Sequence, residues 1–227
     1  MGIIQGIFAF TMISFRPKKF EEDLRLNFEE QMDKCDDPKD EIVKLANIGL
    51  QVVRQQPIIP ATTQVLYLER NNNSILWSFL PKNMSALFLN ENNIQYNSYY
   101  ENPNLKVLSV RKCRNIESLI SNLDRYKNLV DLDISSNNIN FISGQNFSKL
   151  KSLQHLSISY NNLINITSDI VANLKNLRRL NLRGNRIAII SKSAFMTLKK
   201  LEKLDLADNH MIILVIRWLY NSRTKLS

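Results

Sequence analysis

The sequence predicts an α/β repeat solenoid, and three observations lead to this fold class. One pattern of eleven positions recurs seven times, with an interval of 21 or 24 residues between successive starts. Within each copy, two aliphatic residues flank one outward position, which is the alternation of a strand with one buried face. A repeat this short cannot bury its apolar face alone, so neighbouring repeats must stack into a continuous core. The starts are Thr63, Met84, Leu105, Leu129, Leu153, Leu177 and Leu201.

The aliphatic pair, for example Leu132 and Ile134, predicts one short strand in each repeat. Successive strands then align into a parallel sheet on the concave side of an arc. Asparagine occupies the ninth position of six of the seven copies, and Cys113 takes its place in the third copy. The column is Asn71, Asn92, Cys113, Asn137, Asn161, Asn185 and Asn209.

These residues resemble the leucine-rich-repeat family. The resemblance implies a curved, right-handed solenoid with loops and short 3₁₀ or helical segments on the convex face. It also implies that the asparagine amides form a ladder of hydrogen bonds with backbone groups of their own and adjoining turns. Such bonds satisfy buried groups that otherwise cost about 1–3 kcal/mol each. Cys113 is then a buried structural thiol.

The second half of the 24-residue repeats resembles the "typical" subclass of this family. Phe147, Val171 and Phe195 are each followed three residues later by a leucine. That subclass is common in extracellular animal proteins, including Toll-like ectodomains, Slit-like proteins and secreted immune proteins. The resemblance therefore implies a secreted or cell-surface protein, with the cytoplasm as the alternative.

The N-terminal part of the chain divides into three segments before the repeats, which occupy 63–210. Residues 1–15 are apolar and predict either a signal peptide or a segment that packs on the first repeat. Residues 16–41 predict an amphipathic helix and linker, which either caps the solenoid or docks another protein. Residues 42–62 resemble a degenerate N-terminal cap without its cysteine pairs.

The C-terminal segment, 211–227, completes the last repeat and adds a short tail. Its apolar run is too short to span a bilayer, which needs about 20 residues. The chain is either a short form or a piece of a longer receptor.

Composition and motifs argue against catalysis. The chain has two cysteines, two histidines and a net charge of +9, without a metal-binding spacing or a phosphate loop. No run of basic residues or aromatic signature predicts a nucleic-acid partner. Asp131 and Asp133 occupy outward strand positions, where we expect solvated surface carboxylates. The sequence thus predicts a non-enzymatic protein that needs no cofactor or metal.

Function is expected on the outward positions of the strands. Tyr67, Phe88 and Val107 predict an apolar stripe, and arginines and lysines predict two basic spots. Alternatively, the N-terminal segment covers the stripe and the cations are only solvated. The candidate partner-binding residues are Tyr67, Phe88, Val107, Arg111, Lys112, His155, Tyr160, Arg179 and Arg183.

Four Asn-x-Ser/Thr sequons are candidate glycosylation sites. Asn146 and Asn165 are favoured because they fall outside the concave strands, and Asn72 and Asn83 are less favoured.

Three functions fit these features. The first is a recognition module that binds a protein through the concave face, in extracellular innate-immune, receptor-like or adhesion signalling. The second is an intracellular scaffold that regulates an enzyme such as a phosphatase or GTPase. The third is a truncated or decoy form of a larger receptor, and a homodimer is a further candidate assembly.

Overall fold

The structure is a computed structural model, and it places most of the repeats. It describes residues 41–46, 59–71, 74–76, 80–95, 100–191, 193–210 and 225–226. The apolar segment 1–15 and nearly all of the predicted helix, 16–41, lie outside these ranges, as do residues 47–58 of the cap and most of the tail.

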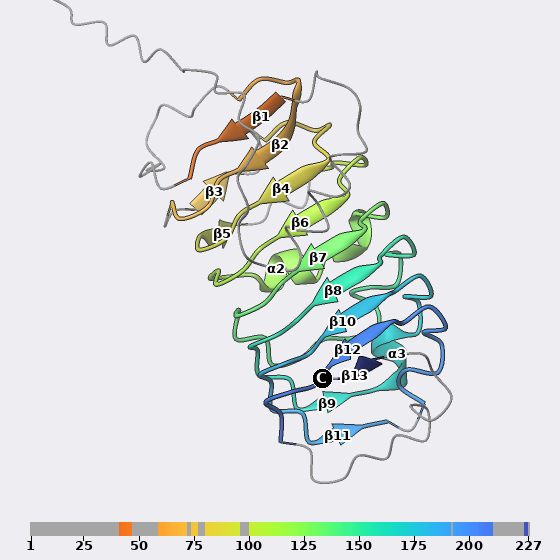
Figure 1. Cartoon of the computed structure of the whole chain (residues 1–227). Coiled ribbons are helices and arrows are strands. Elements are labelled where there is room, and N and C mark those ends of the chain that lie inside the picture. The colour runs from red at the N-terminus through yellow and green to blue at the C-terminus, as the bar shows by residue number, and fades with distance from the viewer. Residues whose placement is uncertain are drawn as a thin grey trace, which may run out of the picture.

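A parallel sheet of nine strands runs the length of the solenoid (Figure 1). Seven of its strands fall one in each repeat, and a leucine of each strand lies opposite the leucine of the next, from Leu66 to Leu204. This stacking confirms the predicted α/β leucine-rich-repeat solenoid. In spatial order the strands are β1 (Glu41–Lys44), β2 (Thr63–Tyr67), β4 (Ala86–Phe88), β6 (Val107–Ser109), β7 (Asp131–Asp133), β8 (His155–Ser157), β10 (Arg179–Asn181), β12 (Lys203–Asp205) and β13 (Lys225–Leu226).

Both outer strands extend the sheet beyond the seven repeats. β1 pairs in parallel with β2, and β13 pairs in parallel with β12. The repeat pattern did not predict β13, because its two residues lack the aliphatic pair that marks the other strands.

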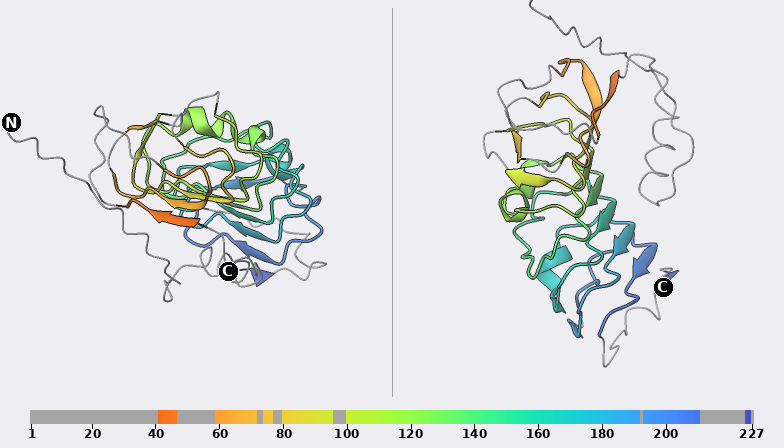
Figure 2. Two further views of the ribbon diagram at one scale, coloured as in Figure 1. Left: turned by 90° about the horizontal axis from the view of Figure 1, so that it is seen from above. Right: turned by 90° about the vertical axis from the view of Figure 1, so that its left-hand side faces the viewer.

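The opposite, convex side carries short elements, seen edge-on in the right-hand view of Figure 2. Phe147, Leu150 and Leu174 are fully or almost fully buried between this side and the sheet, which explains the aromatic and leucine spacing of the longer repeats. Among the described residues, no helix is long and apolar enough to cross a membrane. The convex elements are β3 (Ser74–Leu76), β5 (Asn93–Gln95), α2 (Glu117–Ile120), the 3₁₀ helix η2 (Leu123–Arg125), β9 (Asn165–Ile166), α3 (Ser168–Val171) and β11 (Ile189–Ile190).

A ladder of asparagine side chains joins each turn to its neighbours. The Asn161 amide donates to the carbonyls of Ile158 (3.0 Å) and Ile134 (3.1 Å), one of its own turn and one of the preceding turn. Its Oδ1 accepts from the backbone N–H groups of Asn137 (3.0 Å) and Ile139 (2.9 Å). In the third repeat the Cys113 thiol donates to the Leu89 carbonyl (3.2 Å), so it supplies the donor but not the matching amide oxygen.

The residue before each ladder position has a positive φ angle. Six of these seven residues are not glycine, although L-residues lose roughly 1–2 kcal/mol in the left-handed region. The ladder bonds on either side hold the turn in this shape, since the same angle recurs whatever the side chain. The seven are Arg70, Glu91, Lys112, Ser136, Tyr160, Gly184 and Asp208, with φ between 50° and 66°.

Asn161→Ala should lower the free energy of unfolding by about 2–4 kcal/mol, because it leaves several buried backbone groups without partners. Chemical denaturation measures the loss. Asn173→Ala, which changes an exposed asparagine on the convex side, is the matched control and should stay near the wild type. Equal stability of the two variants would contradict a structural role for the ladder.

Ser136→Gly should raise the free energy of unfolding by about 0.5–1 kcal/mol, because glycine adopts the φ of 60° at this position without steric cost. Ser152→Gly is the control: Ser152 has no positive φ, and glycine there should lower stability by a similar amount. Thermal or chemical denaturation of both variants gives the comparison. A loss of stability in Ser136→Gly would show that the turn is not strained.

Candidate partner-binding face

The outward residues of the sheet fall into two parts that differ in exposure. On β4, β6, β7 and β8 every residue is buried, including those at outward positions. On β10 and β12 the first residue is exposed and the third is half-buried. We call the outward residues of β4 to β8 the closed part and those of β10 and β12 the open part.

An apolar cluster forms one end of the closed part. Val65, Ala86, Phe88 and Val107 pack together, with Ile42 and Tyr67 against them. The Tyr67 and Phe88 rings stack with their centroids 4.4 Å apart.

The predicted stripe therefore exists but is not exposed. Phe88 is 4% exposed, Val107 is 6% exposed and Tyr67 is half-buried. Adjacent strands lie only ~5 Å apart, so large outward side chains cover one another as well as the backbone. The expectation of an exposed apolar stripe is wrong for Phe88 and Val107.

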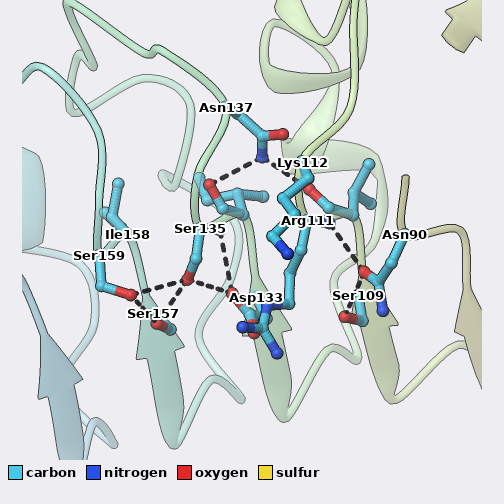
Figure 3. A network of polar contacts seen from close by, with 12 residues as sticks. Asn90, Ser109, Arg111, Lys112, Asp133, Ser135, Asn137, Ser157, Ile158 and Ser159 are labelled. Atoms are coloured by element: carbon cyan, nitrogen blue, oxygen red, sulfur yellow. Dashed lines mark hydrogen bonds and ion pairs between the residues drawn. The ribbon is translucent and has the colours of Figure 1, made fainter. Parts of the chain in front are cut away.

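A polar network continues the closed part beside this cluster (Figure 3). The Asn90 Oδ1 accepts from the Ser109 hydroxyl and from the Arg111 backbone N–H, both at 2.8 Å. The Ser135 hydroxyl lies 2.8 Å from the Ser157 hydroxyl and donates to Asp133. These bonds satisfy side chains on four neighbouring turns of the solenoid, so this region has few groups left to offer a partner.

Asp131 and Asp133 correct a second expectation, because neither is a surface carboxylate. Asp131 is 2% exposed and Asp133 is 5% exposed. Asp133 accepts from the Ser135 backbone N–H (2.9 Å) and lies 3.5 Å from the Arg111 guanidinium. Burial nevertheless raises the pKa of Asp133 above its ordinary value of 3.8, because desolvation outweighs these favourable contacts.

His155 belongs to the same buried region. Its Nδ1 is hydrogen-bonded to Asp131 Oδ1, and the residue is 8% exposed. The other Asp131 oxygen has no hydrogen-bond partner within the part of the chain that the structure describes. His155 is therefore placed as a buried neighbour of Asp131 rather than as an accessible contact residue.

Three of the predicted contact residues lie on the open part or in the turns beside it. Arg179 on β10 is exposed, Tyr160 is 54% exposed, and the Arg183 guanidinium lies 2.8 Å from Asp208. The Tyr160 ring packs against Gly184, where an added Cβ would come within 2.5 Å of the ring. A larger residue at position 184 would have to displace the tyrosine ring, so glycine leaves room for the ring in its present place.

The earlier turns contribute the remaining predicted cations. Lys112 is exposed and lies 3.7 Å from Glu91, whereas Arg111 is half-buried against Asp133. The sequence reasoning missed Lys203, which is exposed on β12 in register with Arg179. Its position in the repeat is the signal that could have found it.

Two observations concern metal-binding and nucleophilic side chains among the described residues. These residues contain no group of three or more histidine, cysteine, aspartate or glutamate side chains that could hold a metal ion. Cys113 is a free, buried thiol, and burial raises its pKa to about 11, so it has little nucleophilic thiolate near neutral pH.

Comparison with known proteins supports the same architecture. The family model described as "Leucine rich repeat" matches residues 103–163 and 156–211. No curated protein matches the chain in sequence. Among solved structures, a chain of the complex between Toll and Spätzle, described as a molecular hub in Drosophila development and innate immunity, matches with a TM-score of 0.51 and 21% identity. The match covers 66% of this chain and 24% of that chain, so this chain spans about a quarter of that relative.

Asp133→Asn should make stability less dependent on pH. Because folding raises the pKa of Asp133, the folded state holds a proton that the unfolded state loses, and the wild type loses stability as the pH rises above 3.8. The free energy of unfolding of the wild type, minus that of Asp133→Asn, should therefore decrease as the pH rises.

Denaturation at a series of pH values measures this difference. Asp205→Asn is the control, since Asp205 makes the equivalent bond to a backbone N–H (3.0 Å) but is only half-buried. A difference for Asp133 that rises with pH would mean that Arg111 and Ser135 outweigh desolvation.

Proposed function

We propose that this leucine-rich-repeat protein is a recognition module that binds a protein partner through the open part of its sheet face. The observation that carries the proposal is the change in exposure at β10, where outward side chains become available. The closed part is already packed and hydrogen-bonded, so a partner gains little there.

The chemistry of the open part favours a partner with an acidic surface. Arg179 and Lys203 stand side by side on paired strands, with Arg183 in the turn that follows β10. Asp205 and Asp208 add negative charge beside these cations, and Asp208 forms an ion pair with Arg183. The surface therefore carries a pattern of both signs rather than a uniform basic patch. Tyr160, packed against Gly184, adds an exposed aromatic side chain of the kind that interfaces favour.

An extracellular role in receptor-like or innate-immune recognition is the form of this function that we favour. Two similarities support it: the "typical" repeat pattern and the likeness to a chain of the Toll–Spätzle complex, itself a complex between two proteins. The cytoplasmic scaffold is the competing form, and retention of the chain in the cytosol would favour it.

Reversing the charge of Arg179 and Arg183 together, to glutamate, should weaken partner binding at least tenfold, because it opposes an acidic partner and turns a glutamate towards Asp208. Affinity capture from extracellular fluid, quantified by mass spectrometry, compares the wild type with this double variant. The partner is a protein that the wild type captures and the variant loses.

Lys175→Glu with Arg186→Glu is the matched control. Both side chains are exposed, lie outside the sheet strands and carry the same change in net charge. If this control loses the same proteins, binding follows net charge alone and the open part is not the binding face. Circular dichroism of each variant shows whether the solenoid is intact.

A further inference from the structure

The described sequons differ sharply in how their side chains are used. The Asn146 Oδ1 accepts from the Ser143 backbone N–H (2.8 Å), and its amide nitrogen donates to the Ile120 carbonyl (3.2 Å) at the end of α2. Asn146 is half-buried and lines a groove on the convex side. A sugar on this nitrogen would displace the contact with α2, so the structure argues against Asn146.

Asn165 has the opposite character. It is exposed at the start of β9, and its side-chain amide makes no hydrogen bond within the described part of the chain. Because β9 is extended, Asn165 and Thr167 project to the same side, while Ile166 between them is 2% exposed. Both groups that define a sequon are therefore presented together to solvent.

Asn83 is the intermediate case. Its side chain is exposed, but Ser85, the hydroxyl residue of that sequon, is half-buried and donates to the Gln64 carbonyl (3.1 Å). In the Asn165 sequon the hydroxyl residue, Thr167, is exposed. The Thr167 side chain is hydrogen-bonded to the carboxylate of Asp169, which is also exposed, and this bond lowers the pKa of Asp169. Asn165 is thus the most accessible sequon that the structure describes.

An apolar column surrounds Asn165. Phe141 and Ile189 occupy the equivalent positions one repeat before and one repeat after it, each 24 residues away. They are 77% and 65% exposed, and Ile164 beside them is 55% exposed. Ile189 pairs directly with Asn165 between β9 and β11, so these two side chains are neighbours on adjacent turns.

Exposed aliphatic and aromatic side chains grouped in this way favour unwanted association. Neighbouring turns are only ~5 Å apart, so a sugar chain attached at the middle of the column reaches over both flanking side chains. Bulky, hydrated sugars on asparagine raise solubility.

We propose that Asn165 carries an N-linked glycan that shields the column of Phe141, Ile164 and Ile189, and this rests on the extracellular form of the proposed function. In the transfer step, a lipid-pyrophosphate oligosaccharide is the donor. The bond from Asn165 Nδ2 to the anomeric carbon forms, and the bond from that carbon to the pyrophosphate oxygen breaks. The lipid pyrophosphate leaves with the electron pair, and the amide gives up one proton. The glycan stands outside the sheet strands and leaves the open part free.

The test expresses the chain in animal cells behind a heterologous secretion leader and analyses its glycopeptides by mass spectrometry. We expect Asn165 to be occupied and Asn146 to be unmodified. Asn165→Gln and Thr167→Ala should each remove the same glycan, and Asn146→Gln should keep it. A secreted protein with an unmodified Asn165, or with its glycan on Asn146, would overturn the proposal.

A second measurement tests shielding without any sequon variant. Enzymatic removal of the glycan from the native protein should increase the binding of an apolar fluorescent dye severalfold. A variant with Phe141→Ser and Ile189→Thr should show no such increase. If glycan removal leaves dye binding unchanged, or if the column instead holds a second copy of the chain in solution, the shielding role fails.

The same expression distinguishes this inference from the proposed function. A parallel arm keeps the chain's own N-terminus, and its retention in the cytosol would remove the extracellular form while leaving site occupancy with the leader unaffected. Partner capture depends on Arg179 and Arg183, so it succeeds or fails independently of the glycan.

Discussion

The hydrogen bonds of the asparagine ladder are the constraint on which the other features of the solenoid depend. Each turn must leave the sheet sharply, and that leaves backbone N–H and carbonyl groups inside the structure with no strand to pair with. The Asn161 amide binds carbonyls of two turns and accepts N–H groups of the turn before it. One side chain thus fixes both the shape of its own turn and its register with the neighbour, and the strand leucines stack because the ladder aligns them.

The same alignment explains why the sheet face is not uniform. Strict register places equivalent outward residues directly beside one another, so the residue types in successive repeats decide whether a column closes or stays open. Tyr67 stacks on Phe88 in one column, and the Ser159 hydroxyl donates to the Ser135 hydroxyl in another. At β10 and β12 the columns hold long cations such as Arg179 and Lys203, and both residues are exposed.

The sequence predicted the fold well because every repeat must bury its leucines against the neighbouring repeat, and this requirement produces the periodic pattern. It predicted the exposure of the site less well. Outward strand positions are solvated in an isolated strand, and the pattern alone places Asp131 and Asp133 there. Their burial depends on what lies beside and above them, and pairwise packing across turns has no signature within a single repeat. The mixture of serines around Asp133 was the available clue, since buried carboxylates need nearby donors.

The column of left-handed residues has a consequence for how such a protein can change. Since the ladder imposes the positive φ angle, the side chain of the residue before each ladder position has little influence on the shape of the turn. Here it is an arginine, a glutamate, a lysine, a serine, a tyrosine, a glycine and an aspartate in succession. Six different side chains and one glycine therefore stand in a row on a backbone of nearly constant φ at the edge of the sheet. Specificity can be rewritten at those six positions one residue at a time, while the core that carries them stays the same.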